Sequence, residues 1–301
     1  MKKTLLSNSF SLSYLFFLLI LASCGVSGKK EAGTGQLDTS AVSEKSAMLN
    51  AVDSLLTIMP KPSAVPNIIA RTGIEYNAGL LSDAKTADKV EGNASATAFC
   101  LGVLGADIAY MAAYEKGKEA MARFGQGKKM ADRIGISGAF DVDMMERLER
   151  NLSNRDSLID LTDGYIRKSS EILKTGEQTK DAALISAGAV IEGLYLTAGL
   201  IREYPTTGLP KEEQDKILVP LYKTLFDQEA SVQNLVFLLE KVGGDSESDK
   251  LLSMLKGLSD IYRKGRWNEK VAASQGKFSS ELFKISELDA SIVKIRQTMV
   301  P

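Results

Sequence analysis

The amino-acid sequence predicts an all-α fold, an antiparallel multi-helix bundle or array of about eight to ten helices joined by short connections. Proline is absent between positions 67 and 204, so no proline interrupts a helix over that stretch. Apolar side chains recur at three- and four-residue spacing in most segments, which is the period of an α-helix. No segment combines an alternating apolar pattern with the turn residues that mark a strand.

Start and stop signals place the helices along the chain. The expected helices span residues 40–59, 94–115, 118–134, 176–203 and 210–241, with others opening at Asp141, capped by Asn154, carrying Leu251–Tyr262 and carrying Ile285–Met299. Pro60 ends the first helix, and Pro62 and Pro66 make the following connector irregular. Gly135 and Gly243 end two other helices, since glycine readily adopts the conformation that follows a last turn.

Polar and proline residues mark several helix starts. Asp141 has the side chain of an N-cap, and Phe140 and Met145 have the spacing of a hydrophobic staple around it. Thr175 and Gln178 have the spacing of a capping box ahead of the helix at 176–203. Pro220 lies inside the helix expected over 210–241, where we expect it to kink or reset the first turns.

The N-terminus has the pattern of a targeting segment. Lys2 and Lys3 precede an apolar run over residues 14–22, which is about half of the ~20 residues that a spanning helix needs. The run ends in Leu-Ala-Ser and then Cys24, an order that resembles the lipobox of bacterial lipoproteins. The resemblance implies a signal peptide over 1–23, a lipid on Cys24, a flexible tether over 24–39 and a helical domain over 40–301. An ordinary secretory signal with an incidental cysteine is the alternative.

Composition excludes several kinds of site. The 301 residues include no histidine and two cysteines, and the formal charge is −1. Without histidine there is no Ser-His-Asp triad and no histidine-ligated metal, so we expect no metal site and no cofactor. The near-zero charge gives no basic surface for nucleic acid. Once Cys24 carries lipid, Cys100 is the remaining thiol, and its apolar surroundings predict a buried, inert side chain.

Two apolar segments carry one acid each. They span 94–114 and 182–201, and each acid is followed three residues later by tyrosine, as Asp107 with Tyr110 and Glu192 with Tyr195. Helices that are apolar all round are buried in a large core or span a membrane. We expect burial, because an acid near the middle of a span is costly and the amphipathic helices need a core to pack on.

The two acids are the candidate site. One interpretation is a polar pocket in which Asp107 and Glu192 face each other, with Tyr110 and Tyr195 as hydroxyl partners, binding a cation, a sugar or a small amine or acting as an acid/base pair. The favoured interpretation is structural, with each acid accepting hydrogen bonds from arginine, tyrosine or backbone N–H groups to fix helix register. A carrier of apolar ligands, with a dry tunnel between the two helices, is a further hypothesis.

The segments at 101–110 and 190–195, with sequences LGVLGADIAY and VIEGLY, resemble an uncharacterised family of all-helical lipoproteins of Bacteroidota-type Gram-negative bacteria. The resemblance extends over most of 40–299, implies the same fold and anchor, and transfers no catalytic residue. We therefore expect a lipid-anchored cell-envelope protein, at the outer membrane, that acts as a binding or scaffolding module with envelope partners. The alternative is an envelope enzyme or small-ligand binder that uses Asp107 and Glu192.

Overall fold

The computed structural model describes residues 50–140, 142–175, 178–205, 207–274 and 283–301. They belong to one compact unit, Ala41–Pro301. Over these ranges the chain forms helices that pack against one another and no strand, which confirms the predicted all-α array. The predicted signal peptide, Cys24, the tether and residues 40–49 of the first expected helix lie outside the described residues.

Residues 50–58 are helical, and Pro60 follows that helix as expected. The helices after it are α2 (Ala64–Arg71), α3 (Thr86–Lys89), α4 (Ala94–Ala113), α5 (Gly117–Arg133), α6 (Val142–Arg150), α7 (Arg155–Thr175), α8 (Thr179–Glu203), α9 (Lys211–Phe226), α10 (Glu229–Val242), α11 (Ser246–Gly265), α12 (Trp267–Ala273) and α13 (Ser286–Met299). Two 3-10 turns, η1 (Ala78–Leu80) and η2 (Ser137–Ala139), lie between them.

The two apolar segments form α4 and α8, which pack against each other and run parallel. At one end, Ser95 of α4 and Lys180 of α8 both donate to the Asp245 carboxylate, at 2.6 and 2.9 Å. At the other end, the backbone N–H and the side-chain amide of Asn77 contact the last turns of α4 and α8. Both first turns therefore meet one residue and both last turns meet another, so the two helices point the same way.

Glycine allows α4 and α8 to approach closely. A Cβ on Gly102 would collide with the backbone carbonyl oxygen of Ile185, and a Cβ on Gly188 would collide with that of Phe99. A backbone oxygen cannot move aside as a side-chain tip can, so any larger residue would push the helices apart. About one turn beyond Gly102 stands Asp107, and about one turn beyond Gly188 stands Glu192.

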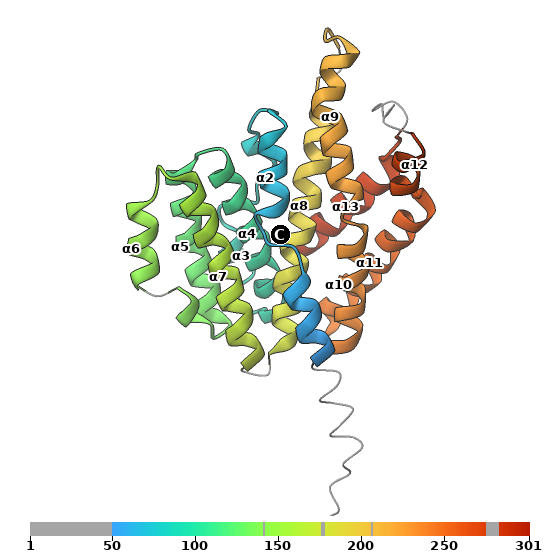
Figure 1. Ribbon diagram of the computed structural model, residues 1–301. Coiled ribbons are helices and arrows are strands. Elements are labelled where there is room, and N and C mark those ends of the chain that lie inside the picture. Colours follow the sequence, from blue (N-terminus) through green and yellow to red (C-terminus); the bar gives the residue numbers. More distant parts are fainter. Residues whose placement is uncertain (1–49, 141, 176–177, 206, 275–282) are drawn as a thin grey trace, which may run out of the picture. The chain divides into compact units, whose positions relative to one another are not determined.

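The remaining helices cover the central pair from both sides. In Figure 1, α5, α6 and α7 lie on one side of α8, and α10, α11 and α13 lie on the other. The contacts agree, because α5 and α7 pack on α4, while α9, α10 and α13 pack on α8. Both central helices are long and apolar enough to cross a membrane, but 94% and 89% of their apolar windows are buried inside this fold. Such burial is typical of core helices.

Several predicted helix ends are confirmed. Gly135 and Gly243 follow α5 and α10 with φ of 77° and 66°, the left-handed region in which glycine is favoured. The Asn154 side chain accepts a hydrogen bond from the Ser157 N–H at 3.0 Å, as an N-cap does. The predicted N-cap Asp141 lies outside the described residues.

Other boundaries differ from the prediction. The capping box at Thr175 and Gln178 is wrong, because Thr175 ends α7 and the Gln178 side chain makes no capping hydrogen bond at the start of α8. The helix expected over 210–241 is two helices, α9 and α10, that divide between Phe226 and Glu229 rather than at Pro220. The break lets the Phe226 ring stack on Trp267 of α12 at a centroid distance of 5.3 Å.

Candidate functional site

Asp107 lies on α4 and is completely buried. Its Oδ2 accepts hydrogen bonds from the backbone N–H of Ser82, at 3.1 Å, and from the Ser82 hydroxyl. Arg123 of α5 donates to the carbonyl oxygen of Ser82 and so holds the loop that carries it. The other oxygen, Oδ1, is buried and has no hydrogen-bond donor among the described residues.

Glu192 lies on α8 and is also completely buried. The Arg296 guanidinium of α13 donates to both of its oxygens, from Nε to Oε2 at 3.0 Å and from Nη2 to Oε1 at 3.2 Å. The Arg296 side chain is 12% exposed, and the Tyr195 ring lies 4.9 Å from its guanidinium carbon. This bidentate, ring-covered arrangement is the geometry that arginine favours for an ion pair away from water.

The two carboxyl groups, which we call the acid pair, are neighbours, and the Asp107 charge acts directly on Glu192. The buried Asp107 Oδ1 has no donor among the described residues, and we infer that the acid pair shares one proton, which satisfies this oxygen. Burial is the main cause that raises the pKa of both acids, and the pKa of Glu192 rises from 4.5 to about 8. The neighbouring Asp107 charge raises it further, and Arg296 opposes this rise. The acid pair therefore keeps one proton at neutral pH and balances the charge of Arg296.

The tyrosines that the sequence placed at this site make other contacts. The Tyr110 hydroxyl accepts a hydrogen bond from the backbone N–H of Asn77 at 3.0 Å, and its ring packs against those of Tyr76 and Tyr114. Tyr195 contributes its ring to the cover over Arg296. The structure thus brings the two acids together but not the two tyrosine hydroxyls. Tyr110 contacts the Asn77 backbone, and Tyr195 contacts the Arg296 guanidinium.

These contacts favour the structural interpretation of the acid pair. Both carboxyl groups have no exposed surface, and neither acid lines the cavities of about 440, 460, 480 and 360 Å³ found among the described residues. None of these cavities is lined by α4 and α8 together, so the tunnel that an apolar-ligand carrier requires is not seen between them. What the arrangement does chemically is bind a proton and join three helices and a loop.

Arg296 and Ser82 complete the site but were not predicted from the amino-acid sequence. Arg296 follows Ile295 within the apolar stripe of the last helix, where a single cation beside the buried face was a usable signal. Two acids on buried helices require a cation as a partner. Which of the many arginines supplies this cation is seen only in the tertiary structure. Ser82 carries no sequence signal, because its role depends on the loop between η1 and α3 lying against α4.

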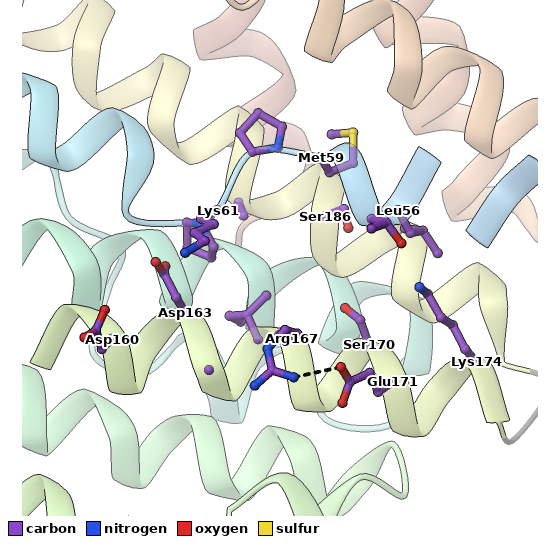
Figure 2. A pocket seen from close by; sticks show the side chains of 16 residues that line it. Leu56, Met59, Lys61, Asp160, Asp163, Arg167, Ser170, Glu171, Lys174 and Ser186 are labelled. Carbon is purple, nitrogen blue, oxygen red and sulfur yellow. Dashed lines mark hydrogen bonds and ion pairs between the residues drawn. The ribbon is translucent and has the colours of Figure 1, made fainter. Parts of the chain in front are cut away.

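An open cleft lies elsewhere on the surface, lined by residues 56–62, α7 and α8 (Figure 2), with a volume of about 440 Å³. We call it the α7 cleft. Its charged side chains are of both signs: Lys61, Arg167 and Lys174, and Asp160, Asp163 and Glu171. Asp163 accepts hydrogen bonds from the Ser63 backbone N–H and hydroxyl, at 3.2 and 2.7 Å, which tie the connector to α7. Burial raises the pKa of Asp163.

No group of three or more acidic or cysteine side chains suited to a metal ion occurs in the part of the chain that the structure describes. The chain matches no protein-family model, no curated protein and no solved structure. The candidate site therefore rests on geometry alone.

Proposed function

We propose that this protein is a lipid-anchored cell-envelope protein, held at the outer membrane through Cys24, whose helical domain acts as a binding or scaffolding module. The lipobox-like order around Cys24 supports the anchor. Two or three acyl chains on one cysteine hold a protein durably, whereas a single chain holds it only marginally. The resemblance to all-helical envelope lipoproteins points in the same direction.

One observation carries the binding role: the acid pair is sealed, whereas the α7 cleft is open and charged. Acid/base chemistry needs a carboxyl group within reach of a substrate, and neither Asp107 nor Glu192 offers this. The α7 cleft instead presents several charged and apolar side chains to a partner, including Leu56, Met59 and Arg167. The alternative is an envelope enzyme or small-ligand binder that uses Asp107 and Glu192. Because both acids are buried, this alternative requires a conformational change that exposes them.

Membrane fractionation tests the anchor. In a Gram-negative host, we expect the wild-type protein in the outer-membrane fraction, with a diacylated or triacylated N-terminal cysteine in its mass spectrum. Cys24→Ala should abolish both, while the matched variant Cys100→Ala, which removes the buried thiol, should leave both unchanged. Recovery of Cys24→Ala with the same acyl mass in the same fraction would contradict the proposal.

Site-specific photocrosslinking tests the binding role. A photoreactive side chain at Ser170, in the α7 cleft, should give a discrete adduct in intact cells. The same side chain at Lys250, which is exposed on α11, is the control and should give none. Equal adducts from both positions, or none from Ser170, would speak against a partner at the α7 cleft. Loss of the anchor alone would not change the cleft, so the two tests separate the two halves of the proposal.

A further inference from the structure

A second cavity, of about 460 Å³, lies where α8 ends and α9 begins, next to the segment 73–77 that follows α2. We call it the Tyr76 cleft. Its lining residues are Gly73, Ile74, Glu75, Tyr76, Asn77, Leu200, Glu203, Tyr204, Pro205, Leu209 and Ile217. Neither the acid pair nor the α7 cleft contributes a residue to it.

Hydrogen bonds from two tyrosines of the α4 end hold one wall of the Tyr76 cleft in place. The Tyr110 hydroxyl accepts from the Asn77 backbone N–H at 3.0 Å, and the Tyr114 hydroxyl donates to the Ile74 carbonyl oxygen at 2.9 Å. The Asn77 side chain crosses to the opposite wall and donates to the Glu203 carboxylate at 2.6 Å. A wall fixed at three points is preformed, which lowers the entropy cost of binding a ligand.

The polar groups that line the Tyr76 cleft all attract cations. Glu75 and Glu203 supply two carboxylates, and no lysine or arginine is among the lining residues. The last turn of α8, a helix of 25 residues, ends in the cleft, and the carbonyl end of a helix dipole attracts cations. Two bases stand beside the cleft and have partners of their own: Arg202 donates to Asp289 at 2.6 Å and stands 3.8 Å from Glu203, and the Lys116 ammonium lies 5.4 Å from the centroid of the Tyr76 ring. The exposed Glu75 is thus left as the carboxylate available to a ligand. The cleft therefore favours a positive charge.

The other residues that line the cleft are suited to contact an apolar part of a ligand. Leu200 and Ile217 line the cleft, and Leu209 at its rim is 38% exposed, one of the few large apolar side chains on the described surface that reach this exposure. Tyr76 and Tyr204 add ring carbon to the same walls. We infer that the Tyr76 cleft binds an organic ammonium ion, a cationic amine carried on an apolar alkyl or aryl group. This inference is independent of the proposed partner at the α7 cleft.

Three small probes with one skeleton test the inference: phenethylammonium, neutral 2-phenylethanol and anionic 3-phenylpropanoate. Each is titrated at neutral pH into the detergent-solubilised mature protein with labelled isoleucine and leucine methyl groups. We expect phenethylammonium to shift the methyl signals of Ile217 and Leu209 and leave the core residue Leu255 unchanged. Phenylethanol should bind at least about fivefold more weakly, since one favourable charge contact is lost, and phenylpropanoate should not bind.

Matched glutamate variants assign the charge. Glu75→Gln removes an exposed carboxylate of the cleft and should weaken phenethylammonium binding about fivefold. Glu149→Gln makes the same change on the exposed surface of α6 and should leave binding unchanged. Circular dichroism of both variants checks that the fold is kept. Equal affinity for phenethylammonium and phenylethanol, no shift at Ile217, or equal binding by the two variants would each overturn the inference.

Discussion

The Arg296 guanidinium donates two hydrogen bonds to the Glu192 carboxylate, at 3.0 and 3.2 Å, across 104 positions of sequence. This contact joins α13, near the end of the chain, to the central helix α8, and Glu192 is in turn the neighbour of Asp107 of α4. Three helices thus meet at one buried proton and one partly buried cation. The stability of the fold should depend on this meeting more than on any surface ion pair.

Replacing Arg296 tests that dependence. Arg296→Met keeps the apolar stem and removes the cation, which leaves the acid pair buried without its counter-charge. We expect a loss of about 3–5 kcal/mol in the free energy of unfolding at neutral pH, measured by urea denaturation. Arg263→Met, which removes an exposed partner of Asp260, should cost less than about 1 kcal/mol. Similar losses for the two variants would show that the buried contact adds nothing.

The shared proton predicts a pH dependence of stability. Unfolded Glu192 ionises near 4.5, but in the folded protein its pKa is about 8. The folded state therefore binds this proton more tightly, so its contribution to stability is complete below pH 4.5 and falls as the pH rises towards 8. Above about pH 8 the contribution is level, because both states have then lost the proton.

Asp107→Asn isolates this contribution. The asparagine amide keeps an acceptor for Ser82 and offers an N–H to Glu192, so Glu192 ionises against Arg296 without a buried proton. We expect the variant to gain stability relative to wild type between pH 5 and 8.5, on the order of 1–3 kcal/mol, in urea titrations across that range. Glu192→Gln should lose stability at every pH, because it leaves the Arg296 cation unpaired. Parallel pH profiles for wild type and Asp107→Asn would refute the shared proton.

The helices α4 and α8 approach closely at Gly102 and Gly188. A single methyl group added at either glycine should therefore lower the free energy of unfolding strongly. Gly102→Ala places a Cβ against the Ile185 carbonyl oxygen, and Gly188→Ala places one against that of Phe99. We expect each to lower the free energy of unfolding by about 3 kcal/mol or to prevent folding. Gly257→Ala, on α11 with nothing within 4 Å, should raise it by about 0.5–1 kcal/mol. Tolerance of both crossing variants would contradict the close approach.

Cys100 should be inert in the folded protein. Its thiol is fully buried and donates to the Met299 carbonyl oxygen at 3.7 Å, and burial raises its pKa to about 12. Thiolate is the reactive form, so Ellman's reagent at pH 8 should give no colour until urea unfolds the chain. Ser170→Cys, at the α7 cleft, is the positive control and should react at once. Fast reaction of native Cys100 would show that this part of the core opens.

Much of the fold was predictable because helix signals are local. The predicted apolar stripe of the last helix is buried at Leu288, Ile292, Ile295 and Met299 and partly buried at Ile285. The apolar runs of α4 and α8 are buried over most of their length, as predicted. Gly135, Gly243 and Asn154 marked helix ends through their own backbone or side-chain chemistry. Prediction failed where the decision was not local, as at Phe226, where stacking on Trp267 accompanies a helix break that Pro220 does not make.

The sequence by itself determined that the chain is helical, that Asp107 and Glu192 stand on buried helices, and that histidine chemistry is absent. Tertiary structure decided that α4 and α8 run parallel, that the two acids share a proton, and that Arg296 and Ser82 complete them. It also decided that Tyr110 holds a cleft wall instead of an acid. The reason is physical: residue type and spacing fix which groups must be satisfied, while the partner of a buried charge is chosen by packing between segments far apart in the chain.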